Sequence, residues 1–272
     1  LYNAGFDPDD MGGMFEQMLH TRNTSQRMPE FMSTHPLDEN RIADSKNRAN
    51  SYPDVQYVES SEYLLMRERV IMNYSGNIVS ELEARQKDLP QLLGARRDAA
   101  LYAISLAQMK TGQFIQATQT AEQLLQQEPS RITYLMLSAE IAIAEGNTDK
   151  ARRILSETLK VNPQNHALTM AYASALAKAG QFDQAAIVLE QHANVFPNDM
   201  QLWNDLAEYQ GQAGNISKVH LARAEYLICT GDFARALDQL NYALTLETDR
   251  LVIARLKQRQ DYIRSIQDKF YR

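Results

Sequence analysis

Gly112-Gln113-Phe114 is the first of four short stretches that decide the fold. It is followed by Gly146-Asn147-Thr148, Gly180-Gln181-Phe182 and Gly214-Asn215-Ile216, each starting 34 residues after the one before. Glycine readily adopts the left-handed conformation that ends a helix, and the polar residue after it suits the turn. The spacing therefore predicts a regular series of helix ends, one for every 34 residues.

Other marks recur at fixed distances from each of these glycines. Five residues after them stand Ala117, Ala151, Ala185 and Val219, and seven residues before them stand Ser105, Ala139, Ala173 and Ala207. Small residues allow two helices to approach closely. Pro129, Pro163 and Pro197 stand twelve residues beyond the three alanines, where a proline stops the second helix. Each unit is predicted to be a helix–turn–helix.

A helix–turn–helix repeated every 34 residues resembles the tetratricopeptide repeat (TPR) family. Trp203 also lies eleven residues before Gly214, where the family pattern places its tryptophan. The resemblance extends over about residues 98–247. It predicts an all-α fold in which residues 98–248 form a TPR helical solenoid.

Three departures from the period shape the predicted domain organisation. Gly231-Asp232-Phe233 repeats the turn only 17 residues after Gly214, so a helix over 216–230 is expected to serve two units. Gly76-Asn77-Ile78 lies 36 residues before Gly112, which predicts connecting helices and an imperfect TPR-like unit over 53–97. Residues 249–272 carry an apolar stripe and many basic residues. They are predicted to form a capping helix, with a basic binding arm as the alternative.

A TPR array binds partners along the surface that its first helices line. By the family pattern, the partner-binding positions in this chain are Tyr102, Met109, Thr133, Met136, Glu140, Met170, Asn204 and Glu208. The alternative for the methionines among them is that they fill the core of the solenoid. The pattern identifies a groove but not its occupant.

Composition excludes several classes of function. The formal net charge is −6 and the pI is about 5.5, which argues against a nucleic-acid binder. A single cysteine, Cys229, cannot form an internal disulfide or a cysteine-rich zinc site. No run of about 18 apolar residues is present, so no transmembrane segment is expected. No signal peptide is visible, and because the sequence starts at Leu1 we expect it to be part of a longer protein.

Residues 1–52 do not follow the 34-residue period. Helices are expected over about 8–20 and from Pro36 to about Asn50, with Tyr52-Pro53 as the domain boundary. Pro36 favours an extended His35 and a helix that begins directly after it, so His35 is expected at the N-cap as a neutral imidazole. One interpretation of His35 is a structural N-cap bonded to backbone. The other is a functional imidazole that accepts a proton or meets a metal.

Three further stretches of this region form a pattern. They are Ala4-Gly5-Phe6-Asp7-Pro8, the Ser-Thr-His-Pro that contains His35, and Arg41-Ile42. Together they resemble the C-terminal end of the M48 family of zinc metallopeptidases. The resemblance implies that residues 1–52 are the C-terminal remnant of a peptidase domain. It places His35 near the zinc, as an additional metal ligand or a contact to the reacting peptide, and Arg41 as an accessory catalytic residue that steadies negative charge.

The family's zinc motif is missing from this sequence. Members hold zinc with the two histidines of His-Glu-x-x-His, whose glutamate is the general base, and with a later glutamate. No His-Glu-x-x-His occurs here, and His166, His192 and His220 each lack a second histidine within four residues. Zinc is therefore expected in the parent protein, with no cofactor for this chain alone, which should be inactive as a peptidase.

Two functions remain from the sequence. By resemblance, the chain is the C-terminal portion of a zinc metalloendopeptidase and chaperone in the bacterial periplasm. Its partners would be outer-membrane β-barrel clients and the barrel-assembly machinery. The alternative is a non-catalytic TPR adaptor that binds a peptide or partner protein in its groove.

The missing motif makes a direct prediction about zinc. Calorimetric titration of the 272-residue chain with Zn²⁺ should detect no stoichiometric site of nanomolar affinity, because one histidine and its neighbours cannot supply the three or four ligands of a tight site. The His35→Ala variant should titrate like the unaltered chain. A stoichiometric nanomolar site would contradict this account of residues 1–52.

Overall fold

The computed structural model describes residues 1–22, 39–53 and 60–270 of the chain. It divides into two compact units, Leu1–Tyr63 and Leu64–Arg272. In the described ranges the secondary structure is entirely helical, which confirms the all-α class. The α-helices are α1 (Asp10–Arg22), α2 (Glu39–Ala49), α3 (Ser61–Tyr74), α4 (Ile78–Asp88), α5 (Gly94–Lys110), α6 (Phe114–Gln127), α7 (Ile132–Ala144), α8 (Thr148–Val161), α9 (His166–Lys178), α10 (Phe182–Ala193), α11 (Met200–Gln212), α12 (Ile216–Cys229), α13 (Phe233–Leu246) and α14 (Arg250–Phe270).

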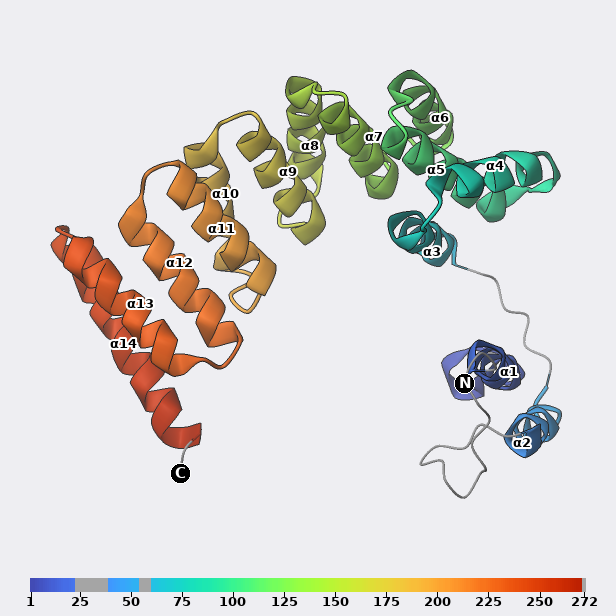
Figure 1. The fold of residues 1–272 in the computed structure, drawn as a ribbon, viewed down its shortest axis with the longest axis horizontal. Coiled ribbons are helices and arrows are strands. Elements are labelled where there is room, and N and C mark those ends of the chain that lie inside the picture. Colours follow the sequence, from blue (N-terminus) through green and yellow to red (C-terminus); the bar gives the residue numbers. More distant parts are fainter. Residues whose placement is uncertain (23–38, 54–59, 271–272) are drawn as a thin grey trace. The chain divides into compact units, whose positions relative to one another are not determined.

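The second unit is a series of helix hairpins, in which each helix from α4 to α14 packs against the next (Figure 1). α5 pairs with α6, α7 with α8, α9 with α10 and α11 with α12. The first helices of the hairpins also touch one another, since α7 contacts both α5 and α9. The predicted helical repeat solenoid is confirmed, and its first helices share one face.

The hairpin turns are built as the glycine spacing predicts. Gly112, Gly146, Gly180 and Gly214 have φ between +74° and +90°, a conformation that other residues adopt only with strain. In the first of these turns the Gln113 N–H donates to the Gln108 carbonyl at 2.8 Å. The same six-residue bond recurs at the other turns, so each first helix ends with its carbonyls satisfied.

Small residues sit where the two helices of a hairpin approach most closely. Ala117, Ala151 and Ala185 are completely buried. In the first hairpin the Ser105 hydroxyl, also fully buried, donates to the Ala117 carbonyl at 2.8 Å. A larger side chain at these positions would separate the helices and open the core.

α12 packs against both α11 and α13, as expected of a helix that serves two units. Gly231 ends it with φ +78°, and Ala236 on α13 is fully buried. α14 follows and buries Leu256 and Ile263 in the same core as α13. The Arg259 guanidinium reaches past α13 to the Glu225 carboxylate on α12, with Nε 2.7 Å from Oε1.

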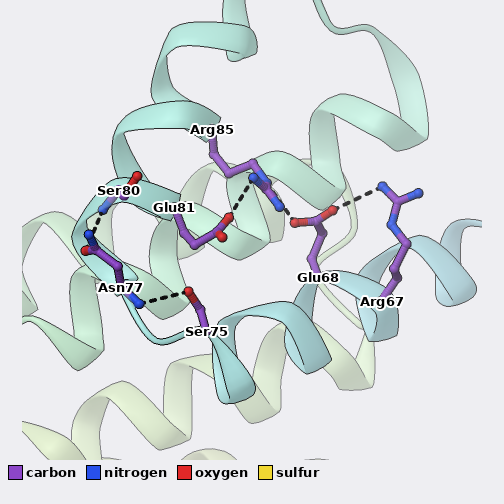
Figure 2. Close-up of polar contacts among 7 residues, drawn as sticks. All are labelled: Arg67, Glu68, Ser75, Asn77, Ser80, Glu81 and Arg85. Atoms are coloured by element: carbon purple, nitrogen blue, oxygen red, sulfur yellow. Dashed lines mark hydrogen bonds and ion pairs between the residues drawn. The ribbon is translucent and has the colours of Figure 1, made fainter. Parts of the chain in front are cut away.

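The α3–α4 hairpin is held by a buried carboxylate (Figure 2). Glu68 on α3 is 4% exposed and accepts hydrogen bonds from Arg85 Nε at 2.9 Å and Arg67 Nη2 at 3.1 Å. Arg85 also bonds Glu81 one turn away on α4. At the turn the Asn77 side chain caps α4 by accepting from the Ser80 N–H at 3.1 Å. Polar contacts therefore replace the glycine turn of the later units.

The first unit contains α1 and α2, which pack against each other. Gly5 has φ +79° and ends a short 3₁₀ helix over Tyr2–Ala4. A Cβ added at Gly12 would lie 2.7 Å from Lys46 Cγ, so glycine permits the close approach of the two helices. Lys46 Nζ lies 2.6 Å from Glu16 Oε1. α1 starts two residues later than expected, and the start of the second expected helix lies outside the described residues.

In the described ranges, none of the helices has the length and apolar character needed to cross a membrane.

Because Glu68 is buried, removing its arginine partner should lower the stability of the chain more than removing an arginine from an exposed ion pair. Arg85→Leu should lower the free energy of unfolding by about 2 kcal/mol, because a carboxylate removed from water loses a charged partner. Urea unfolding followed by circular dichroism measures the change. Arg264→Leu is the matched control, since its ion pair with Asp261 is exposed and should contribute less than about 0.5 kcal/mol. Equal effects of the two variants would contradict the role assigned to Glu68.

Candidate functional site

The first-helix face carries a groove of about 430 Å³, which we call the α7 groove. It lies along α5, α7 and α9. Its lining residues are Met109, Met136, Ala139, Glu140, Ile143, Ala144, Leu155, Ala171, Ser174 and Lys178. Three of the sequence-predicted binding positions, Met109, Met136 and Glu140, are thus brought together. The groove combines an apolar floor with one acidic and one basic residue.

Glu140 is held in place by an arginine from a distant part of the chain. Arg69 Nη1 and Nη2 on α3 each donate to one oxygen of Glu140 at 3.1 Å. Burial tends to lower the pKa of Arg69, but Glu140 and Tyr102 outweigh it and keep that pKa above its ordinary value. A bidentate pair fixes both side chains. The groove therefore presents a Glu140 carboxylate whose orientation is fixed by Arg69.

Tyr102 on α5 holds the Arg69 side chain of this ion pair in position. Its ring is completely buried, and its hydroxyl accepts a hydrogen bond from Arg69 Nε at 2.6 Å. The Arg69 guanidinium carbon lies 5.5 Å from the centre of the ring. Tyr102 is thus placed in the core, where it positions Arg69, and is not exposed in the groove.

Asn204 and Glu208 lie in a different hollow, the α11–α13 pocket, of about 520 Å³. Its lining residues are Trp203, Asn204, Ala207, Glu208, Arg223, Tyr226, Leu227, Arg235 and Gln239. The two remaining predicted positions line neither hollow. Thr133 is half-buried in the first turn of α7, and Met170 on α9 packs against the core that α9, α10 and α11 share.

Sequence reasoning missed the residues that α12 and α13 contribute to this pocket. They are Arg223, Tyr226, Leu227, Arg235 and Gln239. The half-period turn at Gly231 was the available signal, because it makes α12 a first helix as well as a second one. Counted back from Gly231, however, the family's groove positions on α12 fall at Leu221 and Glu225, which do not line the pocket. The repeat pattern therefore does not identify Arg223 and Tyr226.

Two histidines that looked isolated in the sequence meet at the junction of α9, α10 and α11. His166 Nδ1 lies 3.0 Å from His192 Nε2, and His166 Nε2 lies 3.1 Å from Asp199 Oδ2. The Phe196 ring packs against both imidazoles. If His166 Nε2 donates its proton to Asp199, His166 Nδ1 is left as an acceptor. His192 Nε2 is then the donor in the hydrogen bond between the two rings.

Of the peptidase-like residues, His35 lies outside the described ranges, and Arg41 is an exposed residue in the first turn of α2. Across the part of the chain that the structure describes, no three or more His, Cys, Asp or Glu side chains are grouped so as to hold a metal ion. The described residues by themselves therefore do not make up a catalytic zinc site, and no catalytic step is assigned to them.

Comparison with known proteins supports both parts of the sequence reading. The family model described as tetratricopeptide repeat matches residues 142–208. The β-barrel assembly-enhancing protease of Escherichia coli K12 is 29% identical over 278 residues, which cover 99% of this chain and 55% of that protein. The putative β-barrel assembly-enhancing protease of Vibrio cholerae is 29% identical over 272 residues, covering 99% of this chain and 56% of that protein.

The resemblance to a protease with a repeat array is confirmed as a likeness to these curated relatives, whose length the chain spans by about half. Among solved structures, a thermophilic TPR protein of Thermus thermophilus aligns with 75% of this chain and 98% of its own, at 19% identity and a TM-score of 0.41.

The histidine pair predicts a pH-dependent stability. Burial lowers the pKa of His192 in the folded chain, His166 lowers it further, and Asp199 acts in the opposite direction. The unfolded chain therefore takes up a proton first when the pH falls below about 6.5. The stability that neutral His192 contributes to the folded chain is therefore fully present above about pH 6.5. It is lost as the pH falls from there toward the lower pKa that His192 has in the folded chain.

His192→Gln should flatten the decline of unfolding free energy between pH 7.5 and 5.5, as measured by urea unfolding at a series of pH values. Glutamine can still donate to His166 Nδ1, but it does not titrate. His20→Gln changes an exposed histidine on α1 and should leave the decline unchanged. A His192→Gln profile parallel to that of the unaltered chain would contradict the prediction.

Proposed function

We propose that the chain is the C-terminal portion of a zinc metalloendopeptidase and chaperone acting in outer-membrane protein assembly and quality control. In this proposal the repeat array binds a β-barrel client or the barrel-assembly machinery in the periplasm. The observation that carries it is the likeness to β-barrel assembly-enhancing proteases over 99% of the chain. That likeness includes residues 1–52 as well as the repeats.

The α7 groove suits an extended client segment. Met109 and Met136 offer flexible, polarisable side chains that adapt to different apolar residues. Glu140 is already oriented by Arg69, so little side-chain ordering remains to be done on binding. Lys178 and Ser174 on α9 supply further polar contacts. A surface that combines adaptable apolar contacts with fixed polar ones favours many unfolded clients over one tight partner.

Residues 1–52 would belong to the peptidase part of the parent. We propose that His35 stands near the zinc there and that Arg41 is an accessory residue of the same site, both by their resemblance to the M48 motifs. The main ligands and the general base would come from a His-Glu-x-x-His outside this sequence. The sequence directly upstream of Leu1 in the parent gene tests this, since a parent without that motif would leave only the adaptor function.

Client binding through the α7 groove is tested with an unfolded outer-membrane β-barrel protein as the probe. Met136→Asp should weaken its binding to the 272-residue chain about tenfold, because a charge is introduced where apolar side chains dock. Fluorescence anisotropy of the labelled probe measures the affinity. Val161→Asp is the matched control, since Val161 is 78% exposed at the end of α8 and outside the groove.

Two results would contradict the proposal. Equal affinities of the Met136 and Val161 variants would remove the groove from client binding. Binding of an unfolded water-soluble protein as tight as that of the β-barrel probe would favour a general peptide adaptor over a protein dedicated to outer-membrane clients.

A further inference from the structure

The α11–α13 pocket exists because the repeat period is broken at this point. Gly231 follows Gly214 after 17 residues instead of 34, so α12 lies beside α11 as its hairpin partner and also begins the next hairpin with α13. Three consecutive helices therefore contribute to one hollow of about 520 Å³. No other junction of the 98–248 array has this short period.

One wall of the pocket comes from α11 and is preorganised. The indole of Trp203 is fixed by a hydrogen bond from Nε1 to the Pro197 carbonyl at 2.8 Å, and its ring lines the pocket. Asn204 and Glu208 lie beside it, one and five residues further along α11. An aromatic face next to an amide and a carboxylate can hold an apolar side chain and the polar groups of a peptide backbone.

The opposite wall is basic. Arg223 on α12 and Arg235 on α13 both line the pocket, as does Tyr226 on α12. Arg235 is paired with Asp232 at 3.2 Å. Asp232 does not line the pocket, but it neutralises part of the charge of Arg235. Arg223 is exposed, and it makes no hydrogen bond or ion pair with any other described residue. Its guanidinium is therefore available for a carboxylate of another molecule.

Two other arginines of the second unit that lie near a tyrosine ring are already neutralised by a carboxylate of the same chain. Arg69 pairs with Glu140 through both nitrogens, and Arg259 pairs with Glu225. In each case the guanidinium also lies over a tyrosine ring, Tyr102 or Tyr262 respectively. The α11–α13 pocket has the arginine and the tyrosine, but no carboxylate within the described residues is paired with Arg223.

We propose that this pocket binds an extended peptide segment in which an acidic residue directly follows a large apolar one. The acidic side chain pairs with Arg223 and Arg235, and the apolar side chain packs on Trp203 and Tyr226. Asn204 and Glu208 hydrogen-bond the backbone of the segment. The proposal builds on the proposed function in one respect, that the array binds extended segments, and it adds a second subsite with its own specificity.

The test uses the single tryptophan of the chain, which lies in the pocket itself. Acetylated and amidated peptides with the sequence Ser-Leu-Phe-Asp-Ser are compared with the same peptides carrying Asn or Lys in place of Asp. The blocked ends carry no charge. Tryptophan fluorescence reports occupancy, and calorimetry of the 272-residue chain gives each affinity independently of any fluorescence change.

The Asp peptide should bind at least about fivefold more tightly than the Asn or Lys peptide at low salt, with the difference shrinking as salt is added. Arg223→Gln should abolish the preference. Glu208→Gln should keep or increase it, because a like charge is removed while the hydrogen-bond acceptor remains. Arg153→Gln is the matched control, since Arg153 is an exposed arginine on α8.

Failure of the Asp peptide to bind, or equal binding of all three peptides, would overturn the inference. Tighter binding of the Lys peptide, lost in Glu208→Gln, would show that the pocket takes a basic segment and would overturn it as well. Met136→Asp distinguishes this inference from the proposed function. If that variant loses the β-barrel probe while the Asp peptide fails to bind the unaltered chain, only the pocket assignment is wrong.

Discussion

The close approach of two helices within each hairpin is the constraint on which the rest of the structure depends. It requires a left-handed residue at the turn and small residues at the contact, as Gly112, Ser105 and Ala117 show in the first hairpin. A single hairpin cannot bury its apolar residues alone, so each must stack on the next. The buried clusters accordingly include residues from consecutive hairpins. Stacking in turn aligns the first helices, and the aligned faces form the α7 groove.

Local rules explain how much could be predicted from the sequence. A turn glycine and a small residue act over a few positions, so the hairpins from α5 onward follow from spacing alone. Met109, Met136 and Glu140 were also predictable as groove residues, because they occupy repeated positions on first helices. The structure of residues 1–52 followed only in part, since the segment that contains His35 lies outside the described residues.

Long-range charge pairs set the limit of that reasoning. Arg69 and Glu140 are 71 residues apart, and no periodic rule links them, because the α3–α4 hairpin departs from the repeat pattern. From the repeat pattern alone, Tyr102 is expected to be a groove position like the others. In the structure its ring is buried, and its hydroxyl supports the Arg69–Glu140 ion pair. Whether a repeated position is exposed depends on which side chain a neighbouring helix places over it, and this is a property of the packed structure.

The shortened period at α12 shows how a repeat array can acquire a new surface. With one helix fewer in the alternation of first and second helices, the hairpins keep their geometry. α12, however, is then both the second helix of one hairpin and the first helix of the next, and its residues reach the binding side. The loop before α11 holds one wall of this surface in place. Its Pro197 carbonyl fixes Trp203, and its Asp199 caps α11 and pairs with His166. The histidine pair and the aromatic wall of the pocket thus share one loop. The arrangement of the pocket's aromatic wall and that of the histidine pair therefore both depend on the conformation of this one connection.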